Sequence, residues 1–414
     1  MLGRATSAMV QQYVAICFVA VILAAGGAST LVVGVENGLG AVPPMGYNTW
    51  NDFRCDNITA RNVMRVADAI VDTGLGAVGY SYINIDDCWA VSRNPHTFEL
   101  VPDPIAFPDG MKAVADYVHG KGLRFGIYTD RGPLTCANRT GSAGFEGVDA
   151  ETFASWGVDF LKEDSCYADS DHHDVAIADY MRMRDALNAT GRPIFFSLCG
   201  WHTWYAPVGR SLGNSWRISG DVSDWSSVYA AAQLNSELSP FAGPGGWNDP
   251  DMLVGSSAGG AIHNTPEQSR TQFSLWSIMA SPLLIGSNLL GMSKYDLETY
   301  SNTEVIAVNQ DALGVQGKPI ASNCSPSVRL PGSGGDNRVP ECQQVWAKLL
   351  SDGSAALIFV NWAGPATTVE CDSVCLSTAL GSSQDSVYVR DLWKHRDLGV
   401  LSKIRMRVGA DGAS

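Results

Sequence analysis

Basic residues are scarce in this chain. Its 414 residues include 28 Lys and Arg against 42 Asp and Glu, which gives a net charge of −14, and no segment forms a basic patch. A nucleic-acid backbone is bound by concentrated positive charge, so this composition argues against nucleic acid as a partner. Hydrophobic residues make up 45% of the chain. That content is sufficient for a large core and a second, smaller domain.

The first 28 residues have the pattern of a signal peptide. Arg4 supplies the positive charge, residues 13–25 are apolar, and small residues at 26–28 suit cleavage. Because the apolar character continues to Val33, the alternative is an uncleaved membrane anchor of about 20 residues. We expect a protein that is secreted, or that reaches a vacuole or lysosome through the secretory pathway. The same route is indicated by four N-glycosylation sequons, which begin at Asn57, Asn138, Asn188 and Asn323.

Residues 160–166, Phe-Leu-Lys-Glu-Asp-Ser-Cys, indicate a site at the end of a strand. Two apolar residues lead into a charged cluster, which is typical of a buried parallel strand that ends at an open mouth. Side chains alternate along a strand, so Lys162 and Asp164 should share one face and Glu163 the other. The lysine would keep the Asp164 carboxylate ionised, as a nucleophile requires. The alternative for this heptapeptide alone is an ordinary surface ion pair.

Seven further runs resemble strands, and most of them end in polar or aromatic residues. They lie at residues 43–50, 82–89, 123–130, 193–199, 215–219, 246–253 and 282–285. Helical patterns separate many of these runs, at residues 59–73, 111–119, 150–156, 175–187, 226–237 and 267–279. Eight strands, most followed by a helix, predict a (β/α)8 TIM barrel over residues 38–313. The polar strand ends should meet at one mouth of that barrel.

The pattern changes after about Gly314. Residues 317–336 are rich in Gly, Pro and Ser, and β-rich runs follow at 345–350, 355–362 and 387–393. We expect a small C-terminal antiparallel β-domain, a β-sandwich, over residues 314–414. The last residues, 402–414, show little that could close such a sheet, so we expect the domain to be incomplete at its end.

Five motifs are specific enough to suggest a family. In chain order they are Met45-Gly-Tyr-Asn-Thr-Trp50, Ile85-Asp-Asp-Cys-Trp89, Trp156-Gly-Val-Asp-Phe-Leu-Lys162, Asn214-Ser-Trp-Arg217 and Gly245-Gly-Trp-Asn-Asp-Pro-Asp-Met252. With them the chain resembles the α-galactosidases (melibiases) of glycoside hydrolase family 27, from about Gly38 to about Gly399. The resemblance implies a retaining exo-α-galactosidase that releases terminal α-D-galactose from oligosaccharides or glycoconjugates. It implies no cofactor and is compatible with a homodimer.

By this resemblance Asp164 is the nucleophile and Asp221 the acid/base. Retaining hydrolysis needs two carboxyl groups about 5 to 5.5 Å apart, one to form a glycosyl-enzyme and one to protonate the leaving oxygen. Asp224 is the local competitor of Asp221, but it lies further from its strand end. The resemblance also implies sugar-binding roles for Trp50, Asp86, Asp87, Tyr128, Lys162, Cys199, Gly200, Trp201, Arg217 and Asp251.

The same residues are compatible with alternatives to a metal-independent enzyme. Residues 86–87 or 248–251 could hold Ca²⁺ or Mg²⁺, but neither has the spaced ligand loop of such a site, so we expect no metal. His172 and His173 could suggest zinc, although adjacent histidines on a polar loop are usually solvated. A sugar-binding protein without turnover is a further alternative. An inactive descendant need not keep both carboxylates, and this chain has them.

Removal of the leader leaves nine cysteines. In a secreted chain an odd number predicts four disulfides and one remaining thiol. The resemblance implies the bridges Cys55–Cys88, Cys136–Cys166 and Cys371–Cys375. Cys324–Cys342 is then the remaining pair, and Cys199 is the free, buried thiol near the sugar.

Two positions depart from the family pattern. Glu163 stands where the family often has Tyr or Phe, but alternation points it away from the site, so we expect little effect. Gly200 stands where the family's α-galactosidases often carry a Glu that limits space at the sugar's 2-position. A glycine leaves room there, which makes an α-N-acetylgalactosaminidase the alternative function. The neighbouring Trp201 and Trp204 should narrow the pocket, so galactose remains the expected sugar.

Overall fold

The structure is a computed structural model, and it describes residues 37–169, 172–257, 264–324 and 338–414. The predicted signal peptide lies outside these residues. Within the described part of the chain, no helix combines the length and the apolar character needed to cross a membrane.

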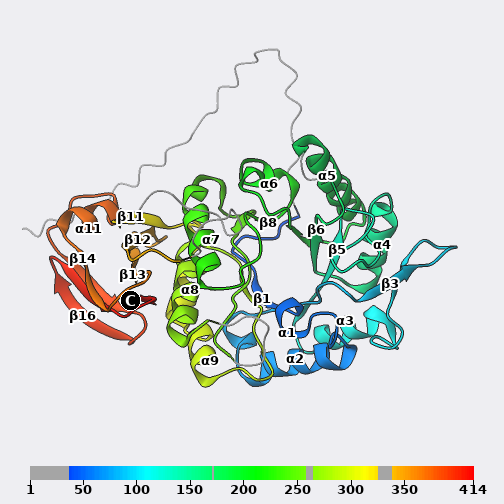
Figure 1. Ribbon diagram of the computed structural model, residues 1–414, viewed down its shortest axis with the longest axis horizontal. Coiled ribbons are helices and arrows are strands. Elements are labelled where there is room, and N and C mark those ends of the chain that lie inside the picture. Colours follow the sequence, from blue (N-terminus) through cyan, green and yellow to red (C-terminus); the bar gives the residue numbers. More distant parts are fainter. Residues whose placement is uncertain (1–36, 170–171, 258–263, 325–337) are drawn as a thin grey trace, which may run out of the picture. The chain divides into compact units, whose positions relative to one another are not determined.

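Eight parallel strands form the barrel that the sequence predicts (Figure 1). In spatial order they are β10 (Leu283–Ile285), β1 (Met45–Asn48), β2 (Tyr82–Asn84), β5 (Arg124–Asp130), β6 (Phe160–Asp164), β7 (Phe195–Leu198), β8 (Ser215–Arg217) and β9 (Trp247–Asp249). A parallel bridge from Leu253 to Ile285 links the segment after β9 to β10. Because all eight strands run the same way, their polar C-terminal ends gather at one end of the barrel.

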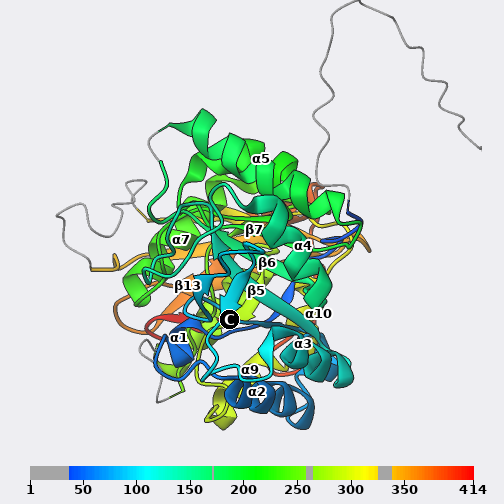
Figure 2. The ribbon, with the colours of Figure 1, turned by 90° about the vertical axis from the view of Figure 1, so that its right-hand side faces the viewer.

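Helices surround these strands, as Figure 2 shows around β5, β6 and β7. The predicted helices are present as α2 (Ala60–Asp72), α3 (Gly110–Gly120), α4 (Glu146–Trp156), α5 (His173–Ala189), α7 (Trp225–Glu237) and α8 (Pro266–Ile278). Four shorter helices were not predicted, because four to seven residues are too few to show a helical period. They are α1 (Trp50–Phe53), α6 (Ala206–Leu212), α9 (Lys294–Tyr300) and α10 (Thr303–Asn309). A hairpin of β3 (Ala90–Arg93) and β4 (Leu100–Pro102) extends the loop after β2.

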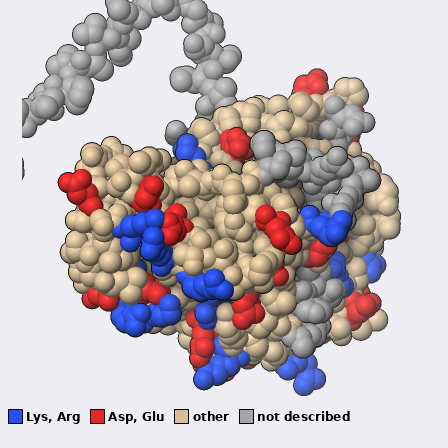
Figure 3. Space-filling view, turned by 60° about the vertical axis from the view of Figure 1, so that its left-hand side comes forward, with Lys and Arg blue, Asp and Glu red and all other residues tan. Residues whose placement is uncertain are grey.

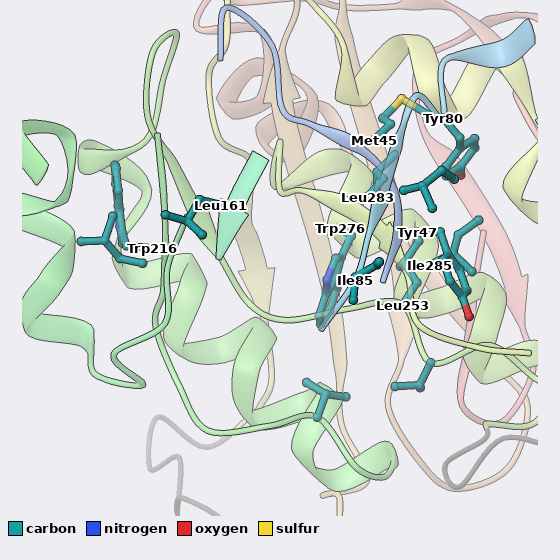
Figure 4. Close-up of a cluster of buried hydrophobic side chains, with 14 of the residues drawn as sticks. Met45, Tyr47, Tyr80, Ile85, Leu161, Trp216, Leu253, Trp276, Leu283 and Ile285 are labelled. Carbon is teal, nitrogen blue, oxygen red and sulfur yellow. The ribbon is translucent and has the colours of Figure 1, made fainter. Parts of the chain in front are cut away.

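The core is dense because large apolar side chains fill it from both strands and helices. Figure 4 shows Tyr47 from β1 and Leu283 and Ile285 from β10 in one buried cluster with Trp276 from α8. Buried aromatic side chains of this kind cover about 150 to 250 Å² each and dominate core energetics. The strand ends therefore project from a rigid scaffold, which can hold polar side chains in fixed positions.

The C-terminal part is antiparallel, as predicted. Its strands are β11 (Lys318–Ser322), β12 (Gln343–Leu349), β13 (Ala355–Asn361) and β18 (Gly412–Ala413) in one sheet, β14 (Thr367–Cys371) with β17 (Ile404–Val408), and β15 (Val387–Asp391) with β16 (Arg396–Leu401). A short helix, α11 (Ser373–Leu380), follows β14. The prediction that residues 402–414 cannot close a sheet is wrong. Ile404 and Val408 are buried while Arg405 is exposed, so this segment alternates as an edge strand does.

Charges of both signs lie next to one another on the face shown in Figure 3. Several basic side chains of the C-terminal sheets are paired with acids, for example Arg390 with Glu304 and Asp397, and Arg405 with Glu370. On the described residues of this face, positive charge is therefore balanced locally rather than gathered for a polyanion.

Candidate active site

Asp164 ends strand β6 at the mouth, with its side chain only 8% exposed. The hydroxyl of Tyr128 donates a hydrogen bond to Oδ2 of Asp164 at 3.2 Å, and Nζ of Lys162 lies 3.8 Å from the same oxygen. The backbone N–H of Ser165 donates to the other oxygen at 3.1 Å. Lys162 and Asp164 share one face, as strand alternation predicts.

The protonation of Asp164 is governed first by burial. Burial raises the pKa of the Asp164 carboxyl, the nearby Lys162 ammonium lowers it, and the Asp86 carboxylate raises it again. The net direction is upward. Lys162 lowers the pKa of Asp164, as expected, but the loss of water on burial outweighs the lysine's attraction. A thiol hydrogen bond from Cys199 also helps to stabilise the charge.

Asp86 lies beside Lys162 at the end of β2. Its Oδ2 accepts hydrogen bonds from Nζ of Lys162 and from Nδ2 of Asn48, both at 2.8 Å. The Asp86 backbone N–H donates to the hydroxyl of Thr49 at 2.9 Å. Asn48 and Thr49 were not singled out in the sequence, although both lie in the motif Met45–Trp50. A polar pair after an apolar strand was the signal that could have found them.

Asp87 is buried beside Asp86 but has backbone partners. Its two oxygens accept the N–H groups of Cys88 at 2.6 Å and Ala137 at 2.8 Å. Burial raises the pKa of the Asp87 carboxyl, and these two hydrogen bonds oppose the rise. Asp87 therefore ties the loop after β5 to the end of β2, next to the predicted sugar position.

Arg217 at the end of β8 connects two carboxylates. Its Nη2 lies 3.0 Å from Oδ1 of Asp221, and its Nη1 lies 2.9 Å from Oδ1 of Asp251. The Asp221 side chain is 65% exposed, whereas Asp251 is buried. Arg217 lowers the pKa of Asp221, while burial raises the pKa of Asp251 to about 6. Asp251 is also held by the backbone N–H of Val222 at 2.7 Å.

Asp224, the local competitor of Asp221, is engaged elsewhere. It is the N-cap of α7, where its side chain accepts hydrogen bonds from the backbone N–H of Ser227 at 2.8 Å and the hydroxyl of Ser226 at 2.7 Å. A capping carboxylate satisfies helix N–H groups that have no other partner. This role explains its presence without any part in catalysis.

Cys199 lies next to Asp164 and Arg217: its thiol hydrogen-bonds to Asp164, and its Sγ lies 3.8 Å from Nη1 of Arg217. It is buried, it is unpaired, and its thiol interacts electrostatically with Asp164, Lys162, Arg217 and Asp221. Burial raises the pKa of this thiol well above its usual value, so it stays neutral and is a poor nucleophile. Asp164 at the end of β6 and Arg217 at the end of β8 thus both adjoin this buried thiol, and Arg217 is in turn paired with Asp221.

Four disulfides are present among the described residues, and they are the four pairs expected: Cys55–Cys88, Cys136–Cys166, Cys324–Cys342 and Cys371–Cys375. The first two lie in loops beside Asp87 and Asp164. In the described chain, one group of acids and cysteines is close enough for a metal ion: Asp130, Cys136, Asp164 and Cys166, with ligand atoms within 4.8 Å. Both sulfurs belong to one disulfide, so neither can act as a thiolate ligand.

The space beside Gly200 is filled, which corrects the expectation that the glycine leaves room. A Cβ at this position would lie 2.0 Å from the ring of Tyr205, which is buried. Tyr205 stacks on Trp204 with centroids 3.8 Å apart, and Trp204 stacks on His173 at 3.9 Å. Folding of the loop after β7 therefore places an aromatic ring where the missing side chain would be. His173 is exposed, as expected, and its ring stacks on Trp204 from the outside.

Two tryptophans lie at the mouth with partly exposed rings. Trp50 begins α1 and is half-buried, with the Arg54 guanidinium 4.8 Å from its ring centroid. Trp201 follows Gly200, is half-buried, and has a φ of 61°. A bulky residue rarely adopts this left-handed conformation outside sites that require it.

Glu163 points away from the mouth, as alternation predicts, into the interior of the protein. Its side chain is fully buried, and neither carboxyl oxygen has a hydrogen-bond partner among the described residues. Burial raises the pKa of Glu163 well above its usual value, and the charges of Asp130 and Glu146 raise it further. Burial at this position therefore favours the neutral form of Glu163.

Comparison with known proteins gives consistent matches. A family profile described as "Alpha galactosidase A" matches residues 42–311, and one described as "Alpha galactosidase C-terminal beta sandwich domain" matches residues 341–414. An α-galactosidase of Cyamopsis tetragonoloba is 44% identical over 372 residues, covering 89% of this chain and 83% of the relative. An α-N-acetylgalactosaminidase of Gallus gallus is 40% identical over 353 residues, covering 79% and 80%.

A solved structure agrees with this result. The α-galactosidase of Saccharomyces cerevisiae, determined with raffinose, superimposes with a TM-score of 0.81 at 27% identity, covering 92% of this chain and 98% of that chain. The fold, the buried polar mouth and the extent of these matches lead to one conclusion. The chain belongs to the melibiase family of glycoside hydrolases and is an enzyme of the α-galactosidase type.

Proposed function

We propose that the chain releases terminal α-D-galactose with retention of configuration, with Asp164 as nucleophile and Asp221 as acid/base. The observation that supports this assignment is that each carboxylate lies beside its own cation, Asp164 beside Lys162 and Asp221 beside Arg217, and that Asp164 and Arg217 both adjoin the Cys199 thiol. Retaining glycosidases require two such groups on opposite sides of the glycosidic bond.

In the first step an Asp164 oxygen bonds to the anomeric carbon while the bond to the leaving oxygen breaks. Asp221 gives its proton to that oxygen, and the galactosyl group remains as an ester on Asp164. In the second step Asp221 takes a proton from water, which attacks the same carbon and frees Asp164. The hydrogen bonds from Tyr128 and from the backbone N–H of Ser165 hold the two oxygens of Asp164 in fixed positions for this attack.

Asp221 needs a proton for the first step, although Arg217 lowers its pKa in the open site. Two features favour proton uptake when substrate binds. Arg217 shares its charge with Asp251, and the exposed Asp221 carboxyl loses water when a sugar covers it. Loss of water favours the neutral acid.

We infer that galactose is preferred over N-acetylgalactosamine. The Tyr205 ring fills the space at Gly200, so the glycine provides no cavity for an acetamido group. Turnover of nitrophenyl α-galactoside against nitrophenyl α-N-acetylgalactosaminide tests this point. Faster turnover of the N-acetylated substrate would make the alternative function correct. We propose raffinose as an oligosaccharide substrate. It ends in an α-linked galactose, and the S. cerevisiae relative was determined with it.

We also propose that the protein enters the secretory pathway and is divided into a catalytic barrel at 38–313 and a β-domain at 314–414. The asparagines of all four sequons are exposed: Asn57, Asn138, Asn188 and Asn323. Exposure is what N-glycosylation requires. Mass spectrometry of the protein secreted by a eukaryotic host, before and after glycosidase treatment, tests the leader and the sequons together. Its mass in solution tests for a homodimer.

A further inference from the structure

Asp130, the last residue of β5, is a buried acid that the proposed mechanism does not use. Its side chain has no measurable exposure, and a carboxyl oxygen lies within 4.8 Å of an Asp164 oxygen. Strands β5 and β6 are neighbours (Figure 1). In their register Asp130 is directly opposite Asp164. The polar end of the strand at 123–130 was visible in the sequence, but none of the five motifs includes it.

The Asp130 carboxyl joins the segments that follow the two strands. Oδ1 accepts the backbone N–H of Gly132 at 2.7 Å, and Oδ2 accepts the backbone N–H of Cys166 at 2.9 Å. The junction is tight, because a Cβ at Gly132 would lie 2.3 Å from the carbonyl oxygen of Cys166. The turn immediately after the nucleophile is therefore held in place through the Asp130 side chain.

Asp130 is surrounded mainly by acids. Asp164 and Glu163 lie on β6, Asp86 and Asp87 follow β2, and Tyr128 precedes it on β5. The cations nearby are otherwise occupied: Lys162 is bound to Asp86, and Arg131 to Asp179, Ser165 and the carbonyl of Asp169. Burial raises the pKa of Asp130 to about 8, with further increases from Asp164 and Asp87 and opposition from the N–H groups of Gly132 and Cys166.

A contact between Asp130 and a disulfide sulfur is also consistent with a protonated Asp130 carboxyl. Sγ of Cys136 lies 3.9 Å from Oδ2 of Asp130 and carries no proton, because it is bonded to Cys166. Only a protonated Asp130 could donate a hydrogen bond in this contact, since a disulfide sulfur can only accept. A neutral carboxyl can do this and still accept both backbone N–H groups.

We propose that Asp130 is a positioning residue for the nucleophile: its neutral carboxyl holds the turn after Asp164, and its ionised form repels Asp164 and stops turnover. This inference rests on the proposed role of Asp164. Two carboxylates this close in a dry site do not both ionise easily. When Asp130 loses its proton to solvent at high pH, its charge repels the Asp164 carboxylate and displaces it from its place.

The test is the pH dependence of kcat/KM between pH 4 and 10, measured with nitrophenyl α-galactoside. This leaving group needs little acid assistance, so the proton of Asp221 affects the profile least. Wild-type activity should fall with a midpoint near pH 8. Asp130→Asn should lose that fall in activity. Its kcat should drop about 10- to 100-fold with KM within about threefold, because a misplaced nucleophile slows the reaction without weakening sugar binding.

Two control variants separate positioning from other effects. Asp149→Asn removes another fully buried carboxyl of the barrel, but one whose partner is Arg93 at 2.5 and 2.8 Å. It should keep the wild-type alkaline fall. Glu163→Gln removes the neighbouring buried acid and should keep that fall as well.

A wild-type profile that stays flat to pH 10 would overturn the proposal, and so would an unchanged profile in Asp130→Asn. If Asp149→Asn lost the alkaline fall in activity, the fall would reflect the stability of the protein. If Glu163→Gln lost it, the fall would belong to Glu163. Either result would overturn the proposal. Even if Asp130→Asn does not fold, the pH profiles of the wild type and of Glu163→Gln can still contradict the proposal. If Asp164→Asn turned over substrate at the wild-type rate, the proposed role of Asp164 as nucleophile would be wrong. Failure of the proposed function can therefore be distinguished from failure of the proposal for Asp130.

Discussion

The two sides of the mouth hold their carboxylates in opposite ways. Asp164 is 8% exposed and fixed by Tyr128, Ser165 and Cys199, and burial raises its pKa. Asp221 is 65% exposed and paired with Arg217, which lowers its pKa. A nucleophile must stay in one place, whereas an acid/base must exchange protons with leaving group and water. Burial therefore keeps the Asp164 carboxylate in a fixed position, and exposure lets the Asp221 carboxylate exchange protons with leaving group and water.

The comparison also shows that the proposed roles depend on substrate. In the open site each pKa shift opposes the role of its group, because the nucleophile must be charged and the acid protonated. A bound sugar would cover Asp221, and a developing positive charge at the anomeric carbon would favour ionised Asp164. The following predictions test each side of this contrast, beginning with the largest effect.

Loss of the nucleophile should nearly abolish turnover. Asp164→Asn keeps the size of the side chain but removes the attacking oxygen's charge, so kcat should fall by at least about 10³-fold. Measured with nitrophenyl α-galactoside, retention of more than a few per cent of the wild-type rate would exclude Asp164. Circular dichroism should show an intact fold.

Loss of the acid/base should depend on the leaving group. Asp221→Asn should slow raffinose hydrolysis by about 10²- to 10⁴-fold, and the first step on an activated aryl galactoside much less. Asp224→Asn is the matched control, since that carboxylate caps α7 and should affect stability rather than leaving-group dependence. Equal losses of Asp221→Asn on both substrates would argue against an acid role.

The raised pKa of Glu163 should make the free energy of unfolding decrease as pH rises. Its folded pKa is raised above the ordinary 4.5, so its contribution is fully present below that pH and is lost as pH rises toward the folded pKa. The loss is at most about 1.4 kcal/mol per pH unit. Denaturant unfolding between pH 4.5 and 7 should show a shallower decline for Glu163→Gln than for wild type.

The control for this variant is Glu237→Gln, at the exposed end of α7, which should leave the decline unchanged. A Glu163→Gln protein that loses stability with pH as steeply as wild type would show that Glu163 ionises freely when folded.

The smallest effect concerns Gly200. Gly200→Ala places a methyl group 2.0 Å from the Tyr205 ring, so it should destabilise the protein by about 1 to 3 kcal/mol. Gly147→Ala, in α4 with no atom within 4 Å of the new methyl group, should not lower the melting temperature. Equal melting temperatures for Gly200→Ala and wild type would mean that Tyr205 moves freely, and the pocket argument for galactose would lose its basis.

Much of this molecule follows from local pattern. Apolar runs that end in charge predicted the barrel strands, and alternation placed Lys162 with Asp164 and Glu163 opposite. The motifs identified the family, because they combine residue types at spacings that chance rarely produces. Short helices such as α6 and the closing strands β17 and β18 escaped prediction, since a few residues carry little periodicity.

Other properties depended on contacts between distant segments. A sequence does not state how much water surrounds a side chain, so neither the raised pKa of Asp164 nor the isolation of Glu163 could be predicted. The ring of Tyr205 reaches Gly200 only because the loop after β7 folds back on itself. Asp130 became notable when the chain brought Gly132 and Cys166 to its two oxygens. Residue types and order determined the family and the chemistry available to it. Burial and three-dimensional proximity, which arise only when the barrel closes, decided the charge state and freedom of each carboxylate.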